Sequence, residues 1–435
     1  MPKTNTKLRN AQGIISEYNL SGDDFSDDEL IRFRDSLNGL DDKRHQSYVR
    51  HRISDVVIMV FLALLANVDE WDEIEVFLDA KADWFISLLG LNHGIPSHDT
   101  MQAVIGSIEP QALTGIYLGF VIGKINTYSE MARHDDPFKK PDKSIVSVDG
   151  KTSRGSAGKD TGNGKTRPLH TLNAVSSDYG FCIGQVFVPE KTNEITAVGD
   201  LLDLIDVTDT VVTWDALNTQ KDNVRKVIGK KGDYVVALKA NHGTLLEEVR
   251  DYLCDDGLLK NNPLVEYHET KEKEHGSVIT RRYILSKEVD WIYDRKSWAG
   301  LGAVGCCQKT IAPLGGGEPV TETRYYLSSV TDVQLFARSV RQHWSVESFH
   351  WQMDFTFRDD ANRTRDKKSA KNLQIMKKSA LALLTLVKPI YRKRISIKNI
   401  RLSICTNFEK EIPRIFSMLD EEKVKTLLYG SGKLK

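Results

Sequence analysis

Apolar residues recur at helical spacing through the first third of the chain. Matches to the i, i+3, i+4 pattern predict helices over residues 53–65, 71–77, 84–91, 101–108 and 113–125. A break falls at Gly94–Thr100, because Pro96 stops one helix and Ser97 or Asp99 can cap the next. We therefore expect an all-α N-terminal domain over residues 1–140, with a polar, proline-containing linker at its end.

At residue 144 the pattern changes to short β-branched runs bounded by turn residues. These runs predict strands over 144–150, 168–177, 181–190, 210–216 and 233–240, with amphipathic helices over 194–205 and 219–228. Three strands followed by helix–strand–helix–strand is the order of an RNase H-like mixed sheet. We therefore expect an α/β fold in which helices flank that sheet.

The rest of the chain is expected to interrupt and then complete this core. The interval 241–323 is charged and strand-rich, which predicts a β-rich insertion, and residues 336–360 predict one long helix after it. The expected domains are thus the N-terminal domain (1–140), the first part of the core (141–240), the insertion (241–323), the completion of the core (324–390) and a basic C-terminal tail (391–435).

Three carboxylates stand out in the expected core. Asp149 and Asp215 each end a β-branched run, and Glu347 shares a face of the expected helix with Trp344 and Trp351. The aspartates also have structural explanations, since Asp149 can close a tight turn and Asp215 can cap a helix. A carboxylate on an apolar face is costly unless a positive charge meets it. Together the three predict a metal site with oxygen ligands, which suits Mg²⁺, with Mn²⁺ as a substitute.

Such a site suits phosphate chemistry. Two ions about 4 Å apart can activate an attacking water or 3′-hydroxyl and stabilise the leaving oxygen of a phosphodiester. Lys151, Lys239 and Arg341 are candidates to stabilise charge on the phosphate. The rival interpretation pairs Glu347 with His350 as an iron-binding Glu-x-x-His motif, but a di-iron bundle needs further glutamates that a strand-rich core does not supply.

The formal net charge is zero, yet the charges are unevenly distributed. Residues 17–30 carry six acids and no base, whereas 363–401 carry thirteen Lys or Arg and one acid. A solvated helical face and a DNA-backbone contact surface both explain the basic run, and its place directly after the acidic residues favours DNA. The candidate DNA contacts within it are Arg363, Arg365, Lys367, Lys368 and Lys371.

Trp344 and Trp351 have two alternative roles. They can pack the helix onto the sheet, which is the usual role of large aromatic residues, or one of them can stack on an unpaired base. Nothing in the chain predicts a membrane span, because the longest apolar run, 56–66, is shorter than the roughly 20 residues required. The N-terminus does not resemble a signal peptide, and five cysteines without a CxxC predict a cytoplasmic protein.

Several motifs in this order resemble the bacterial insertion-sequence DDE transposases of the H-repeat-associated type. The resemblance covers about Asp41–Leu386 and is carried by GIPSHDT, VSVDGKTSRGS, EKTNEITAV, VVTWDALNTQ, DYVVALKANHGTL and the long stretch VRQHWSVESFHWQMDFTFRDDANRTR. It implies an RNase H-like core whose catalytic and metal-binding triad is Asp149, Asp215 and Glu347. It further implies cleavage of double-stranded DNA at terminal inverted repeats, strand transfer to target DNA, and action as a homodimer or higher oligomer at the nucleoid.

The chain departs from the family pattern at several positions. Ser348 stands where Asn is common, Asn218 stands where His is common, and Val340, His343 and Asp354 stand where the broader group places Tyr, Arg and Lys. Two alternatives therefore accompany the expected transposase. One is a domesticated or catalytically inactive remnant that binds DNA without cutting it, and the other is a stand-alone metal-dependent nuclease.

Overall fold

The computed structural model describes residues 28–135, 143–157, 167–189, 194–274, 276–388 and 395–420. The chain divides into two compact units. The sheet unit takes its described residues from 140–151 and 171–348, and the helical unit from 4–139, 152–170 and 349–435. The helical unit thus combines the N-terminal helices with the C-terminal part of the chain.

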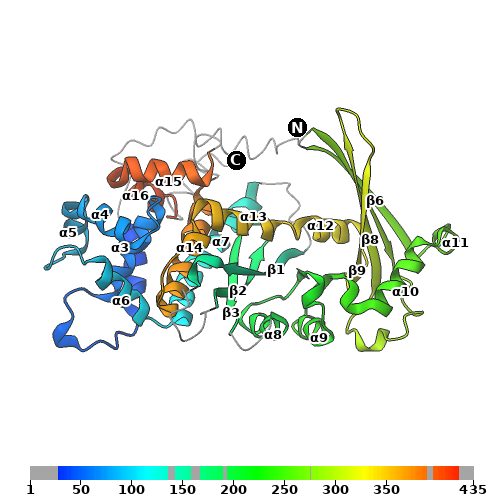
Figure 1. Cartoon of the computed structure of the whole chain (residues 1–435), viewed down its shortest axis with the longest axis horizontal. Coiled ribbons are helices and arrows are strands. Elements are labelled where there is room, and N and C mark those ends of the chain that lie inside the picture. The colour runs from blue at the N-terminus through cyan, green and yellow to red at the C-terminus, as the bar shows by residue number, and fades with distance from the viewer. Residues whose placement is uncertain are drawn as a thin grey trace. The chain divides into compact units, whose positions relative to one another are not determined.

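One mixed sheet of nine strands forms the sheet unit, in the order β3-β2-β1-β4-β5-β9-β8-β7-β6 (Figure 1). Its strands are β1 (Ser144–Ser153), β2 (Leu169–Ser176), β3 (Phe181–Phe187), β4 (Thr210–Trp214), β5 (Asp233–Leu238), β6 (Val265–Glu274), β7 (Ser277–Ser286), β8 (Ala303–Pro313) and β9 (Val320–Ser328). β1, β4 and β5 pair in parallel, while β2 with β3 and the pairs from β5 to β6 are antiparallel. The expected α/β fold with a mixed sheet is confirmed.

Helices cover both faces of this sheet, which explains the continuous apolar runs of its central strands. Val146 and Val212 belong to the core beneath α8 and α9, and the neighbouring Ile145 and Val211 belong to the core beneath α12. Figure 1 shows α8 and α9 on one side of the sheet and α12 on the other. The helices of this unit are α8 (Glu194–Leu204), α9 (Lys221–Gly229), α10 (Gly243–Cys254), α11 (Asp256–Leu259), α12 (Val333–Gln342) and α13 (Ser345–Trp351).

The segment expected to form an insertion extends the core sheet. Its two ends lie side by side, because β9 pairs with β5 with Ser328 opposite Val235. Strands β6 and β7 form the expected long hairpin, in which Glu274 lies opposite Ser277. The sheet unit therefore has a single continuous backbone ladder from β3 to β6.

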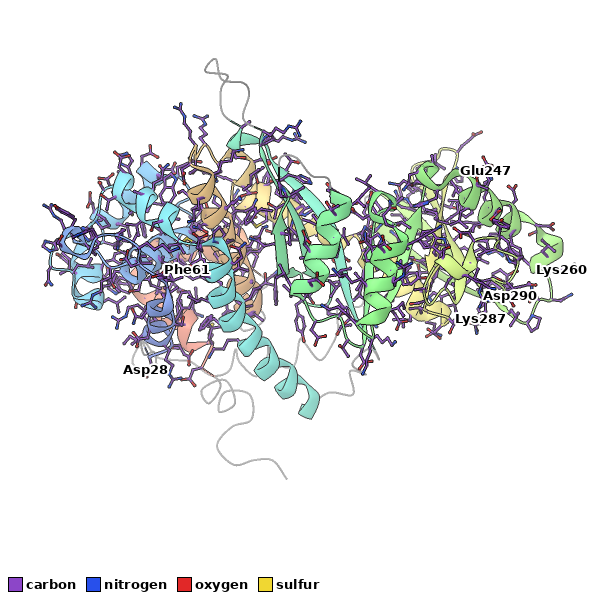
Figure 2. The ribbon with its side chains drawn as sticks, turned by 90° about the horizontal axis from the view of Figure 1, so that it is seen from below. Asp28, Phe61, Glu247, Lys260, Lys287 and Asp290 are labelled. Carbon is purple, nitrogen blue, oxygen red and sulfur yellow. The ribbon has the colours of Figure 1, made fainter. Side chains whose placement is uncertain are left out.

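The helical unit is built around α14. Its helices are α2 (Asp28–Ser36), α3 (Ile53–Leu65), α4 (Trp71–Asp79), α5 (Ala82–Leu89), α6 (His98–Ser107), α7 (Pro110–Asp135), α14 (Lys367–Val387), α15 (Ile397–Thr406) and α16 (Phe408–Ser417). α14 packs against α3, α6 and α7, and Phe61 of α3 lies in the interior (Figure 2). Ser97 caps α6 by accepting a hydrogen bond from the Thr100 amide, as predicted. No helix within the described ranges combines the length and apolarity of a membrane span.

Helix α14, which forms the middle of the basic run, is placed differently from either expectation, whereas residues 389–394 of that run lie outside the described residues. Most of α14 is buried, including Lys377 and Lys378, so this helix is neither a solvated face nor an open DNA-contact surface. Lys378 donates a hydrogen bond to Gln374 on the same helix, at 3.1 Å. The reason is tertiary packing, because α3, α6 and α7 surround a helix whose composition alone suggests exposure.

A buried ion pair joins the two ends of the helical unit. The Arg401 guanidinium on α15 lies 2.7 Å from the Asp69 carboxylate, and both side chains are fully buried. Arg401 also donates to the carbonyl oxygens of Leu64 and Thr356, and its guanidinium lies 4.0 Å from the centre of the Phe357 ring. Arg401 therefore ties the end of α3 and the segment after α13 to the C-terminal helices.

Replacing Arg401 by methionine should lower the free energy of unfolding by about 3–5 kcal/mol, because it leaves the Asp69 charge buried without compensation. Chemical denaturation of the full chain measures the loss. The matched control is Arg225→Met, which removes an exposed ion pair with Asp222 and should cost no more than about 1 kcal/mol. Equal stability of the two variants would contradict the structural role of Arg401.

Candidate active site

Asp149 and Asp215 lie where two neighbouring parallel strands reach the same level. β1 and β4 pair with Val148 opposite Trp214, so an aspartate follows each partner directly. The parallel ladder ends at this pair, although β1 itself continues to Ser153, and open α/β sheets bind ligands beyond the carboxyl ends of their parallel strands. The strand pairing thus brings together two of the three carboxylates predicted from the sequence.

Asp215 uses its two oxygens differently. Oδ1 accepts a hydrogen bond from the Leu217 amide at 3.1 Å and caps the short turn Ala216–Asn218. Oδ2 lies 3.9 Å from the Lys239 ammonium, which follows β5 and is exposed. The capping role and a place in an acidic site are therefore compatible for this residue, and Lys239, one of the candidate phosphate contacts, lies beside it.

Glu347 lies on a short helix, and the expectation of one continuous helix over 336–360 is wrong. α12 ends at Gln342, α13 runs over Ser345–Trp351, and a π-helical turn follows over Gln352–Thr356. The break falls at His343, whose ring nitrogen Nδ1 lies 3.0 Å from the hydroxyl of Thr213 on β4. A side-chain contact with the sheet therefore marks the point where the helix is interrupted.

Buried hydroxyl groups hold this break against the sheet. The Thr213 hydroxyl lies 3.1 Å from that of Ser147 on β1, which lies 2.8 Å from the hydroxyl of Ser177. Ser345, the first residue of α13, donates to Ser177 at 2.9 Å. Burial lowers the pKa of His343 to about 4, so its ring is neutral at pH 7 and adds no charge to the network. These contacts fix α13, and with it Glu347, relative to β1 and β4.

The pKa of Asp149 is affected by several neighbouring carboxylates. Burial, opposed by a hydrogen bond from the Gly150 amide and assisted by the negative charges of Asp215, Glu194 and Glu347, raises the pKa of Asp149 to about 7. All three predicted residues are thus close enough to interact electrostatically. As they stand, no three Asp, Glu, His or Cys side chains in the described ranges form a group that could hold a metal ion.

The donor set nevertheless fits a hard divalent cation. The converging groups offer carboxylate oxygens, which Mg²⁺ and Mn²⁺ prefer. The like charges that surround Asp149 repel one another, and a cation placed among them would remove that repulsion. The side chain of Asn218, three residues after Asp215, is fully buried, and its Oδ1 lacks a hydrogen-bond partner within the described part of the chain.

The interpretation that both tryptophans pack the helix onto the sheet is wrong for Trp351, whereas the Trp344 ring contacts side chains of β8 and β9 and remains partly exposed. Trp344 and Trp351 are 37% and 55% exposed, whereas Val346, Phe349 and Met353 form the buried side of the helix. The sequence spacing of apolar residues could not distinguish the buried side of this segment from the exposed side, because both sides carry large apolar residues at i, i+3 and i+4. Lys309 and Arg324 each lie 5.3 Å from the centre of the Trp344 ring.

The other predicted phosphate contacts of the sheet unit are less accessible. Lys151 is buried, and Arg341 lies 3.5 Å from the Glu272 carboxylate and 3.7 Å from that of Glu274. Arg341 lines a cavity of about 250 Å³, whose other cationic and aromatic lining residues include Arg281, Lys309, Arg324 and Trp344. Burial lowers the pKa of Arg324, but its hydrogen bond with Glu322 and neighbouring negative charges, including that of Glu347, together raise that pKa, so Glu347 acts on a residue that lines this cavity.

The candidate DNA contacts of the helical unit fall into two groups. Arg363 and Arg365 are exposed and line a cavity of about 380 Å³. Lys367 donates to the carbonyl of Arg167 at 3.2 Å, Lys368 lies 2.6 Å from the Glu109 carboxylate, and Lys371 is half-buried. The two arginines are therefore the more accessible of the five.

Sequence reasoning missed Glu194 and Arg324 near the site. Glu194 is the first residue of α8 and lies in EKTNEITAV, one of the motifs that carry the family resemblance, but no role was assigned to it. Arg324 lies on β9, far from the other site residues in sequence. The contact of Glu194 with Gly150 and the pairing of β9 with β5, which are tertiary features, place these residues near Asp149 and Glu347.

Comparisons with known proteins agree with the motifs. Residues 140–384, more than half of the chain, match the family model described as "Transposase DDE domain", and residues 34–121 match the model described as "DDE_Tnp_1-associated". "Putative transposase YncI" of Escherichia coli O157:H7 is 32% identical over 382 residues, which cover 85% of this chain and 92% of that protein. "H repeat-associated putative transposase YhhI" of Escherichia coli K12 is 29% identical over 362 residues, which cover 82% and 91%. The predicted family resemblance is confirmed.

Among solved structures, the chain is similar to a piggyBac transposase in a synaptic complex with hairpin DNA. The sequence identity is 11% and the TM-score is 0.42, over 98% of this chain and 83% of that one. A likeness of this size does not establish a shared fold.

The exposure of the two tryptophans leads to a stability prediction. Trp344→Ala and Trp351→Ala should each lower the free energy of unfolding by no more than about 1 kcal/mol, the scale of an exposed cation–π contact. Phe349→Ala on the buried side should lower it by about 3–5 kcal/mol, because it opens a cavity in the core. Urea denaturation of the three variants makes the comparison. A tryptophan loss as large as that of Phe349→Ala would contradict the assignment of the exposed side.

Proposed function

The chain belongs to the family of transposases with a DDE domain, and we propose that Asp149, Asp215 and Glu347 are its catalytic carboxylates. The observation that supports this most is the parallel pairing of β1 with β4, which places two aspartates at one edge of the sheet. Glu347 interacts with Asp149 electrostatically from the opposite element, α13. The three residues come from three different parts of the chain, as a site assembled by the fold requires.

Transposases of this family generally use divalent metal ions, and we infer that the three carboxylates hold Mg²⁺, or Mn²⁺ in its place, as two ions. When bound, the ions supply Lewis-acid activation of a water or 3′-hydroxyl and stabilise the leaving oxygen. The chain's own residues supply the rest. Lys239 offsets part of the acidic charge beside Asp215, and the hydroxyl network beneath His343 keeps Glu347 in place. Arg324 and Lys309 offer positive charge to the DNA phosphates.

The proposed substrate is double-stranded DNA at the inverted repeats that end the element, followed by target DNA. Water would cleave the phosphodiester at each end, and the freed 3′-hydroxyl would attack a phosphodiester of the target, with displacement of its 3′-oxygen. Because two ends must be cut and joined, we infer that the protein acts as a homodimer or higher oligomer on DNA, at the bacterial nucleoid. Arg363 and Arg365 would contact the DNA backbone.

The catalytic assignment is tested by changes that remove one charge and keep the volume. Asp149→Asn, Asp215→Asn and Glu347→Gln should each lower the rate of Mg²⁺-dependent cleavage more than about 100-fold, since loss of an outer-shell partner alone costs 10–100-fold. The assay uses the full chain and DNA that ends in the repeats flanking its gene. The controls, Asp290→Asn and Glu247→Gln, alter exposed surface residues of the sheet unit (Figure 2) and should cleave like the parent.

The same assay separates the alternatives. A parent protein that binds its repeats but never cuts them, with Mg²⁺ or Mn²⁺, would identify an inactive remnant. Cleavage without preference for the repeats and without strand transfer would identify a stand-alone nuclease. Full cleavage by Glu347→Gln would remove Glu347 from the site.

The DNA-contact assignment predicts a change in salt dependence. The double variant Arg363→Gln, Arg365→Gln should bind all DNA sequences more weakly, and its slope of log affinity against log salt should fall by about 1.8, or 0.9 for each lost phosphate contact. Lys260→Gln, which removes one positive charge at an exposed lysine after α11 (Figure 2), is the control and should leave the slope unchanged. An unchanged slope in the double variant would show that the two arginines do not contact the backbone.

A further inference from the structure

Glu194 occupies a position that only a glycine neighbour allows. A methyl group added at Gly150 would lie 2.4 Å from Oε1 and 2.8 Å from Cδ of Glu194, which is closer than real Cβ atoms come to other atoms. Gly150 directly follows Asp149 on β1. Because residue 150 has no side chain, there is room for the Glu194 carboxylate beside β1, next to the residue that follows Asp149.

A buried amide contacts Glu194 from the Asp215 side. Asn218 is fully buried, and its Nδ2 lies 3.4 Å from Oε2 of Glu194. The backbone of Asn218 is held in place. Its N–H donates a hydrogen bond to the Asp215 carbonyl, and its carbonyl oxygen accepts one from the Asn223 side chain. Glu194 thus contacts both strands of the site. It lies against Gly150 of β1 and contacts Asn218 in the turn after β4.

The orphaned oxygen of Asn218 indicates a ligand that the protein atoms do not supply. Buried amides normally satisfy both their donor and their acceptor groups. Oδ1 belongs to the same planar amide as the Nδ2 that contacts Glu194, so this acceptor lies at the edge of the same site. A water molecule held by a divalent cation is a donor that could satisfy it.

We propose that Glu194 is a fourth carboxylate of the active site, which binds a divalent cation together with Asp149 and is positioned by Asn218. This inference rests on the proposed function. Four carboxylates carry a charge of −4, which balances two divalent cations, whereas three leave one positive charge unbalanced.

Metal binding without DNA tests the role of Glu194. Glu194→Gln in the full chain should lower Mn²⁺ affinity, measured by titration calorimetry, more than about 10-fold. Gly150→Ala should give a similar loss although it leaves every carboxylate in the sequence, because the added methyl displaces Glu194. Glu247→Gln, at an exposed glutamate of α10, should keep the parental affinity (Figure 2).

Stability in a chelator distinguishes a metal-binding role from a structural one. Glu194→Gln removes a repelling charge, so the metal-free variant should be at least as stable as the parent in urea. Lower metal-free stability together with parental Mn²⁺ affinity would overturn the inference. A parental Mn²⁺ affinity in Asp149→Asn would instead contradict the proposed function. A loss of Mn²⁺ affinity in Asp149→Asn together with full Mn²⁺ affinity in Glu194→Gln would contradict the Glu194 inference alone.

Discussion

Asp149 and Asp215 meet because β1 and β4 run in the same direction with Val148 opposite Trp214. Parallel pairing needs helices on both faces, and the two hydrophobic cores supply them through α8, α9 and α12. A shift of one residue in this register would move either aspartate to the other face of the sheet. The chemistry at the edge therefore depends on apolar packing that lies several residues away.

The site combines like charges with a neutral scaffold. The carboxylates around Asp149 destabilise one another, while the contacts that hold them are uncharged, namely the His343 ring and the hydroxyls of Thr213 and Ser147. The hydroxyl network adds no positive charge of its own, and Lys239 beside Asp215 offsets only part of the acidic charge. In the proposed metal site, the repulsion between carboxylates would lower the stability of the metal-free protein and would be relieved when a cation binds.

The sequence predicted the fold well where local pattern and burial agree, as in β1, β4, β5 and α3. It failed for residues 336–360, because apolar spacing marks Trp344 and Phe349 alike although only Phe349 is buried. It also could not reveal that Lys377 is enclosed by other helices. The three carboxylates were visible as residue types at strand and helix ends, but Glu194 was not, because its contact with Gly150 exists only once the sheet has formed.

Arg401 connects this fold to the integrity of its gene. Arg401 forms hydrogen bonds with the Asp69 side chain and with the carbonyl groups of Leu64 and Thr356. All three residues are translated before Arg401, so these bonds cannot form until Arg401 has been added to the chain. A gene copy interrupted upstream of this codon would encode a helical unit with a permanently unpaired buried charge. Such a product would also leave the carbonyl groups of Leu64 and Thr356 without the guanidinium that they accept hydrogen bonds from.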